Sequence, residues 1–377
     1  MPWKESSRMS SRLEFVMLAS APGVNMQAIC QSFGISRKTG YKWRDAYLQR
    51  GEDGLADRSR RPLSSPKRCG DELEAAVLAL HDSYPCWGAR KLKALLPEAA
   101  GNPHPNTIVA ILRRHGRQLV PHVDAVQPAN SRFEHEAPNR LWQMDFKGHI
   151  ALTNVRAGRC HPLTVLDDHS RFSLCLAACS GEDRLQVQAA LTRTFLTYGL
   201  PERITCDNGT PWGTAGHGTL SRLEVWLMRL GIRVSHSRPY HPQTQGKDER
   251  FHRTLKRELL NRFGFSSIAA CQESFNTWRD QYNLIRPHEA LGQKAPVTRY
   301  TPSARSLPAQ LAPIEYDEGD TVRKVRRHGQ VYFGGRHFFV GEGLYDELVA
   351  IRPTDEDGIF KVVFCEKEVS RIDLTTG

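Results

Sequence analysis

The sequence predicts a multidomain α/β protein with N-terminal helix-turn-helix units, a mixed-sheet core and a C-terminal small β-barrel. The length of 377 residues points to several domains, because domains usually span roughly 100–200 residues. Helical patterns fill the first third of the chain, and strands alternating with helices follow. Short strands separated by glycine turns end it.

Charge and composition indicate which kind of molecule the protein binds. The chain has 52 Lys+Arg against 41 Asp+Glu, and residues 1–68 alone hold 13 against 6. A basic end of this kind favours a nucleic acid, although a basic enzyme with a solubilising surface has a similar composition. The nine cysteines lack CxxC spacing, which argues against a zinc site. No apolar run approaches the ~18–20 residues that span a bilayer, and the N-terminus lacks a signal peptide. We therefore expect a cytoplasmic protein without membrane contact.

Residues 1–60 are predicted to form a helix-turn-helix DNA-binding domain. Two short helical patterns lie within residues 25–50, where Asn25 and Ser36 are N-caps and Gly34 ends the first helix. The start of the second helix is polar and cationic, as in a helix that enters the major groove. An ordinary helical hairpin with a solvated charged face is the alternative. The predicted DNA contacts of this helix are Ser36, Arg37, Lys38, Thr39, Tyr41 and Lys42.

Residues 61–118 read as a basic linker followed by a second helical, helix-turn-helix-like unit. Three arginines around the start of this stretch suit a phosphate backbone, namely Arg58, Arg60 and Arg61. In the third helix of the unit, Asn106 is the expected N-cap, and the expected DNA contacts are Asn106, Thr107 and Arg113. A bundle that only packs remains the alternative. A Pro-rich polar linker, 119–138, follows.

The core and the tail differ in their pattern of apolar and polar residues. Residues 139–296 alternate β-branched strands with amphipathic helices, which predicts a mixed sheet with trailing helices. The tail, 314–377, contains "VYFGGRHFFV", in which two apolar runs are joined by Gly-Gly. That pattern predicts a hairpin, and the remaining short strands predict a small β-barrel.

Three carboxylates stand out in the core. Asp145, in "WQMDFKG", and Asp207, in "ITCDNGTPW", each interrupt an apolar strand. A charge in a core strand is unfavourable unless it is paired or bound to a metal. In the helix 246–260, Asp248 shares a face with inward-pointing Phe251 and Leu255. Its neighbour Glu249 shares a polar, cationic face with His252, Arg253 and Lys256, so we expect Glu249 to be the acid shown to a substrate.

Three converging carboxylates would form a divalent metal centre. Oxygen ligands suit Mg²⁺ or Mn²⁺, and two such ions in one site would serve phosphoryl transfer. The alternative is that these acids are unrelated and serve capping or turn roles. Asp167 and Asp168, in "LDDHSRF", are assigned turn and hydrogen-bonding roles. For Arg286, in "YNLIRPHEAL", packing and contact with DNA or a partner chain are equally open.

These blocks resemble the signature blocks of the DDE transposases of bacterial insertion sequences. The relevant blocks are "WQMDFKG", "ITCDNGTPW", "SRPYHPQTQGKDERFHRTLKREL" and "WRDQYNLIRPHEALGQKAP". That family shares the RNase H-like catalytic core of retroviral integrases, and its acids fall on Asp145, Asp207 and Glu249. One departure is the 42 positions between Asp207 and Glu249, longer than is usual. The excess lies in the Gly-rich "GTPWGTAGHGTLSR", which is either a mobile flap or an insertion.

The resemblance implies a Mg²⁺-dependent polynucleotidyl transferase with two ions per active site. It implies nicking at the ends of an insertion sequence, strand transfer, and binding of double-stranded DNA at terminal inverted repeats and target. It also implies a homo-oligomer on DNA, at least a dimer, in the bacterial cytoplasm at the nucleoid. Cations near the site are expected to hold phosphates, namely Lys247, Arg250, Arg253 and Lys256. The alternatives are a catalytically silent DNA-binding regulator derived from a transposase, and a nuclease of the same fold.

Overall fold

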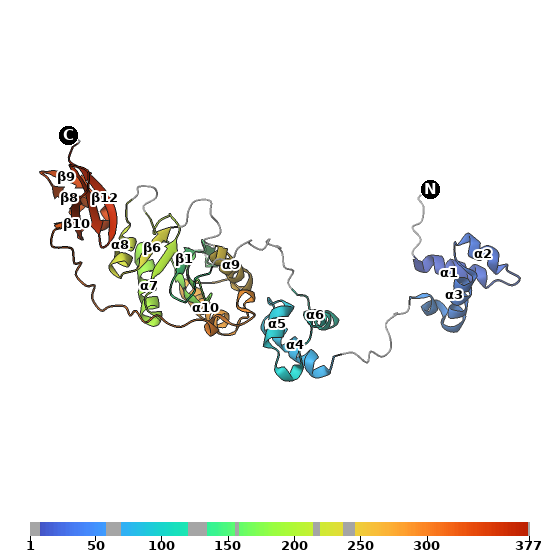
Figure 1. The fold of residues 1–377 in the computed structure, drawn as a ribbon. Coiled ribbons are helices and arrows are strands. Elements are labelled where there is room, and N and C mark those ends of the chain that lie inside the picture. The colour runs from blue at the N-terminus through green and yellow to red at the C-terminus, as the bar shows by residue number, and fades with distance from the viewer. Residues whose placement is uncertain are drawn as a thin grey trace. The chain divides into compact units, whose positions relative to one another are not determined.

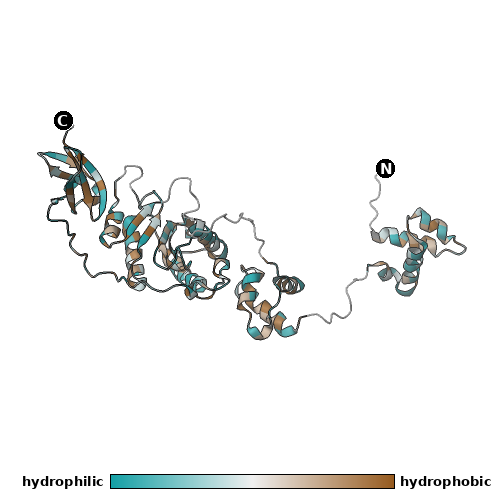
Figure 2. Cartoon of the chain, in the orientation of Figure 1, coloured by the Kyte–Doolittle hydropathy of each residue, from teal (hydrophilic) through white to brown (hydrophobic). Residues whose placement is uncertain are grey.

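The computed structural model describes residues 8–57, 69–119, 134–154, 158–213, 219–236 and 246–375 (Figure 1). The chain divides into two compact units, Met1–Cys69 and Gly70–Gly377, which are described separately. Along the described helices and C-terminal strands, hydrophobic residues alternate with hydrophilic ones (Figure 2). No helix in those ranges is both long enough and apolar enough to cross a bilayer.

The first unit is a small helical domain. Its elements are α1 (Arg8–Ala19), α2 (Met26–Ser32), α3 (Arg37–Arg50) and the 3-10 turn η1 (Gly51–Leu55). The Asn25 side chain caps α2 by accepting from the next backbone N–H groups, and Ser36 caps α3. Gly34, at φ +62°, turns the chain between these helices. The predicted caps and turn are confirmed.

The second unit begins with three helices. They are α4 (Asp71–Ser83), α5 (Ala89–Leu95) and α6 (Pro105–Arg114), with a 3-10 turn, η2 (Glu98–Ala100), before the last. The prediction that Asn106 caps α6 is wrong. His104 is the cap, and its Nδ1 accepts from the Asn106 N–H at 3.2 Å. Pro105 occupies the first helical position, where its fixed φ and missing N–H suit a helix start, so the helix begins earlier than predicted.

A six-stranded mixed sheet forms the core that follows. Its strands are β1 (Trp142–Phe146), β2 (Ile150–Ala151), β3 (Arg159–Asp167), β4 (Ser173–Cys179), β5 (Arg203–Cys206) and β6 (Arg233–His236). The order is β2-β3-β1-β5-β6, with β4 also paired to β3. Strands β2, β3, β4 and β1 pair antiparallel, whereas β1, β5 and β6 run parallel. The predicted mixed sheet is confirmed.

Helices cover both faces of this sheet. The elements are α7 (Arg184–Tyr198), α8 (Arg222–Arg229), α9 (Gly246–Leu255), η4 (Lys256–Leu260), α10 (Ile268–Asp280), η5 (Gln281–Ile285), η6 (Glu289–Leu291) and η7 (Pro296–Thr298). One hydrophobic core joins Trp142 and Met144 of β1 to α7 and α8. Another joins the opposite face to α9 and α10, through Phe251 and Phe275. Since strand side chains alternate, Gln143 and Asp145 of β1 face α9.

The C-terminal segment contains two open sheets. Its elements are β7 (Thr321–Lys324), η8 (Arg327–Gly329), β8 (Gln330–Phe333), β9 (Arg336–Phe339), η9 (Glu342–Leu344), β10 (Leu348–Pro353), β11 (Ile359–Phe364) and β12 (Lys367–Asp373). The Gly334-Gly335 hairpin joins β8 to β9 as predicted. The predicted closed barrel is not observed among the described strands. The four-stranded sheet has the order β12-β11-β10-β7 and remains open, because none of its described strands pairs with β8 or β9.

The C-terminal sheets share a hydrophobic core with α8. Leu220 and Val225 pack in one cluster with Leu344 and residues of the strands. A Cβ atom at Gly343 would lie only 2.1 Å from the carbonyl oxygen of Leu220, so the two backbones are in close contact. An ion pair between Arg229 and Glu347, at 2.6 Å, joins the same elements.

Gly343→Ala tests this contact. The added methyl group meets a backbone carbonyl that cannot rotate away, so we expect the free energy of unfolding to fall by about 1–3 kcal/mol. The control is Gly319→Ala, since nothing lies within 4 Å of a Cβ at that position. It should change stability by less than about 0.5 kcal/mol. Urea unfolding followed by circular dichroism measures both; equal stabilities would contradict the docking.

Candidate active site

Strand β1 places Asp145 at one edge of the site. Its side chain is 28% exposed and lies on the face of the sheet that α9 covers. Burial, and after it the nearby Asp207 carboxylate, raises the pKa of Asp145 to about 6. A carboxyl group whose ionisation is disfavoured by a neighbouring carboxylate is typical of a site that binds a cation.

Asp207 follows β5 and lies level with Asp145. In the parallel pairing, Trp142 is opposite Ile204 and Gln143 is opposite Thr205. Continuing this register by two residues sets Asp145 opposite Asp207. The carboxyl ends of parallel strands therefore bring the first two predicted acids to one edge of the sheet.

His236 and Glu224 hold the backbone of Asp207 through hydrogen bonds. His236, at the end of β6, lies with Nδ1 2.7 Å from the Asp207 carbonyl oxygen and Nε2 2.9 Å from Glu224 Oε1. Both partners are acceptors, so both ring nitrogens donate, and the hydrogen bond to Glu224 raises the pKa of His236. No motif in the sequence predicts this pair. The only local signals are a His that ends a strand and a Glu in the first turn of α8.

The acids of α9 lie on different faces. Asp248 is 1% exposed, with Phe251 and Leu255 on the same buried face, as predicted. Glu249 is exposed, also as predicted. The expectation that His252 shares the cationic surface is wrong, because that side chain is buried.

His252 connects α9 to the sheet at Asp145. The Thr164 hydroxyl donates to the Asp145 carbonyl oxygen at 3.0 Å, so His252 Nε2 donates to Thr164 Oγ1 at 2.8 Å. The Nδ1 lone pair then faces Asp145, with Oδ2 3.9 Å away. Burial lowers the pKa of His252 to about 3, so the ring is neutral. A neutral imidazole fits here, because the hydrogen bond from Nε2 to Thr164 needs only one ring proton.

The three predicted acids are only partly brought together. Asp145 and Asp207 interact, whereas Glu249 lies on the exposed side of the helix that packs on β1. Across the described residues, no three Asp, Glu, His or Cys side chains are arranged to hold a metal ion. The donor chemistry nevertheless fits Mg²⁺ or Mn²⁺, because Asp145 and Asp207 offer oxygen ligands whose mutual repulsion a cation would relieve.

The predicted DNA contacts lie on the surface of their helices where the structure describes them. On α3, Arg37, Lys38, Tyr41 and Lys42 are exposed, and Thr39 is half-buried. Ser36 Oγ is occupied as the cap, since it accepts from the Thr39 N–H at 3.2 Å. Arg58, Arg60 and Arg61 lie outside the described residues. On α6, Asn106 and Arg113 are exposed and Thr107 is half-buried.

The cations of α9 and η4 divide into two groups. Arg250, Arg253 and Lys256 are exposed and available to a phosphate. Lys247 is not, because its ammonium is bound to the carboxylate of Asp168. The prediction that Lys247 holds a phosphate therefore conflicts with its observed partner.

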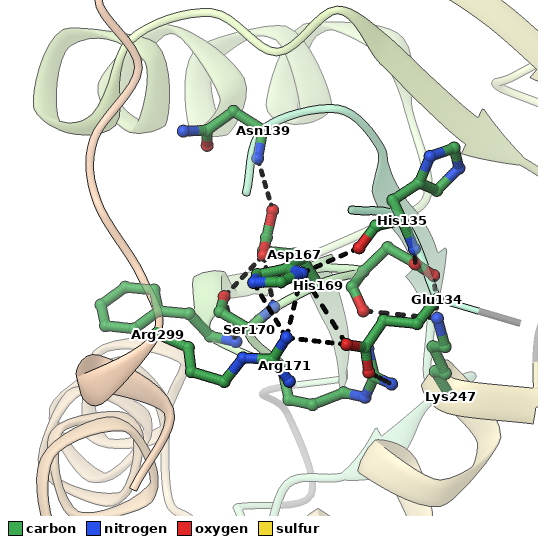
Figure 3. A network of polar contacts seen from close by, with 11 residues as sticks. Glu134, His135, Asn139, Asp167, His169, Ser170, Arg171, Lys247 and Arg299 are labelled. Atoms are coloured by element: carbon green, nitrogen blue, oxygen red, sulfur yellow. Dashed lines mark hydrogen bonds and ion pairs between the residues drawn. The ribbon is translucent and has the colours of Figure 1, made fainter. Parts of the chain in front are cut away.

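The turn after β3 forms a buried polar network (Figure 3). Asp167 accepts from the Ser170 N–H at 2.7 Å and the Asn139 N–H at 2.8 Å. Asp168 also accepts hydrogen bonds, from the His135 backbone N–H and from Gln143 Nε2. The turn and hydrogen-bonding roles expected for both acids are therefore confirmed. Of the two alternatives for Arg286, the structure favours packing: its guanidinium is buried and pairs with Glu258 at 2.9 Å.

Comparisons with known families cover most of the chain. Integrase core domains match residues 135–242 and 230–296. A helix-turn-helix domain matches residues 11–62, and a homeodomain-like domain matches residues 39–112. The C-terminal domain of IS481 family transposases matches residues 320–377.

Three curated relatives come from bacterial insertion elements. An uncharacterized 39.2 kDa protein of IS476 from Xanthomonas euvesicatoria is 27% identical over 64% of this chain and 68% of its own length. An uncharacterized 31.7 kDa protein of IS407 from Burkholderia multivorans is 27% identical over 62% of this chain and 82% of its own. The transposase for IS904 from Lactococcus lactis is 29% identical over 44% of this chain and 63% of its own.

Thr164→Val tests the connection between α9 and the sheet. Valine keeps the shape of threonine but leaves the His252 N–H buried without an acceptor, so stability should fall by about 1–3 kcal/mol. Thr194→Val is the matched control. That hydroxyl bonds the carbonyl oxygen of Ala190 within its own helix and the weakly polar thiol of Cys175, so its loss should cost less than about 1 kcal/mol. Urea titrations compare the two; equal losses would show that the bridge contributes nothing specific.

Proposed function

We propose that the chain is an insertion-sequence transposase with an integrase-type core that catalyses metal-dependent end nicking and strand transfer of its element. In this proposal, hydrolysis nicks the DNA at the element's ends and frees a 3′-hydroxyl group. That hydroxyl then attacks a target phosphodiester. The single observation that carries the proposal is the parallel register that sets Asp145 level with Asp207 at the sheet edge.

The catalytic residues would be Asp145, Asp207 and Glu249. Asp145 and Asp207 would share metal ligation, and Glu249 would complete the ligand set. Bound Mg²⁺ or Mn²⁺, two ions per site, would activate the attacking oxygen and neutralise charge on the phosphate. The His236–Glu224 pair holds the Asp207 backbone, so it keeps this carboxylate at the edge of the sheet. Exposed Arg250, Arg253 and Lys256 would orient the DNA backbone.

DNA recognition would fall to the helical domains. The exposed polar start of α3 would enter the major groove of the terminal inverted repeats. The second helical unit would extend that contact through α6. The proposed active form is an oligomer, at least a dimer, that holds two DNA ends and the target. Its proposed setting is the bacterial cytoplasm, on nucleoid DNA.

Substitution of the three acids tests the chemistry. Asp145→Asn, Asp207→Asn and Glu249→Gln should each reduce nicking and joining of labelled end DNA at least about 1,000-fold, since charge stabilisation worth several kcal/mol is lost. DNA binding by mobility shift should persist. Asp248→Asn is the matched control, because this buried neighbour is assigned no ligand role.

The outcomes separate the alternatives. A silent regulator would give a mobility shift without products, and a nuclease of the same fold would give nicks without joined DNA. If Asp248→Asn abolished chemistry while Glu249→Gln preserved it, the assignment of the third acid would be wrong. Loss of binding in all the variants would mean that the acids are structural.

The DNA-binding surface of α3 is tested by Arg37→Ala combined with Lys38→Ala. The affinity for end DNA should fall, and the slope of log K against log salt should decrease by about 0.9 for each phosphate that the variant no longer neutralises. Arg50→Ala is the control, because Arg50 ends the same helix roughly 20 Å away at 1.5 Å per residue. Fluorescence anisotropy over a salt series measures both. Equal effects at the two ends would argue against docking through the start of α3.

A further inference from the structure

The carboxylate of Asp168 connects three segments of the core. It is 1% exposed and accepts from the backbone N–H of His135 at 2.9 Å, from Gln143 Nε2 of β1 at 2.8 Å, and from Lys247 Nζ of α9. A buried carboxylate is stable only when it is paired and hydrogen-bonded. The turn after β3 is thereby attached both to the strand of Asp145 and to the helix of Glu249.

The attachment between α9 and the turn after β3 is an ion pair between Lys247 and Asp168. The Lys247 side chain is 19% exposed, and its ammonium contacts the carbonyl oxygen of Asp168 at 3.3 Å as well as the carboxylate. Lys247 is the second residue of α9 and precedes Glu249 by two positions. The ion pair therefore holds the first turn of the helix against the sheet.

A second attachment lies five residues further along α9, where His252 donates to Thr164. Two attachments on one helix fix its rotation about its own axis. At roughly 100° per residue, Glu249 lies about 60° from His252 around the helix, on the far side of His252 from Lys247. Asp248 lies about 40° from His252 on the buried side, so this rotation keeps Asp248 against the sheet and Glu249 on the exposed side of the helix.

The buried carboxyl group of Asp248 favours a different rotation of α9. Both of its carboxylate oxygens are buried and neither has a hydrogen-bond partner. Burial of an unpartnered carboxyl group is unfavourable, so a rotation of α9 that exposed Asp248 would relieve it. Such a rotation, about 100° for one residue, would present Asp248 where Glu249 now lies. The pair of Asp168 and Lys247 opposes it.

We propose that Asp168 and Lys247 are positioning residues whose ion pair sets the rotation of α9, so that Asp248 stays buried against the sheet and Glu249 stays on the exposed side, where it is available to a metal ion. This inference rests on the proposed function, because it assigns Glu249 to the metal-binding set. It also reassigns Lys247, which forms an internal attachment instead of a phosphate contact.

The test uses the full chain with Asp168→Asn, Lys247→Met and the double variant. Hydrogen–deuterium exchange of a peptide covering residues 246–255 reports on the attachment, and electron paramagnetic resonance measures Mn²⁺ affinity without DNA. Each single variant should exchange about 10-fold faster in this segment and bind Mn²⁺ about 10-fold more weakly. The double variant should be no worse than either single one, because both remove the same interaction. Lys247→Arg keeps the charge and should restore Mn²⁺ affinity to within about 2-fold of wild type.

Asp320→Asn is the matched control. It breaks the ion pair with Arg352 in the C-terminal segment and should leave both measurements of α9 unchanged. Unchanged exchange in Lys247→Met would overturn the proposal, even if Asp168→Asn failed to fold. The proposal is also wrong if Lys247→Met weakens DNA binding while Asp168→Asn does not, since Lys247 would then hold a phosphate. Failure of the proposed function would appear separately, as a wild-type protein that neither nicks nor joins DNA.

Discussion

The parallel pairing of β1 with β5 is the constraint on which the site depends. It sets two carboxylates level at one edge of the sheet, where burial and the Asp207 carboxylate raise the pKa of Asp145. Neighbouring features offset this repulsion. His236 donates from one ring nitrogen to the Asp207 carbonyl oxygen and from the other to Glu224, so a positive charge lies beside Asp207. In the proposed function, the carboxylates would bind cations and the arginines of α9 would bind DNA.

The sequence predicted features that depend on local pattern. The caps at Asn25 and Ser36, the Gly34 turn and the Gly-Gly hairpin each require only a few neighbouring residues, and all are observed. The mixed sheet followed from the alternation of strands and helices. The inward face of α9 followed from helical periodicity, which separates Asp248 from Glu249 by about 100°. For these elements, short-range stereochemistry and burial agree with the final fold.

The remaining features depend on contacts between distant residues. Lys247 reaches Asp168 across 79 positions, and His252 reaches Thr164 across 88. Periodicity placed His252 on the polar face of α9, and only the packing of that helix on the sheet shows that the side chain is buried. The expected barrel is an open pair of sheets, because closure depends on which strands find partners and not on strand count. The third carboxylate likewise stays on the exposed side of its helix, so its role remains a prediction.

The hydrophobic core shared between α8 and the C-terminal sheets has a consequence for how such chains diversify. The segment that matches the transposase C-terminal domain begins at residue 320, yet its interior is completed by Leu220 and Val225, about a hundred residues upstream. A tail acquired by recombination from another element would meet a mismatched helix and an unfilled interior. Exchange of this tail for a divergent one would therefore require the recipient's α8 to change with it.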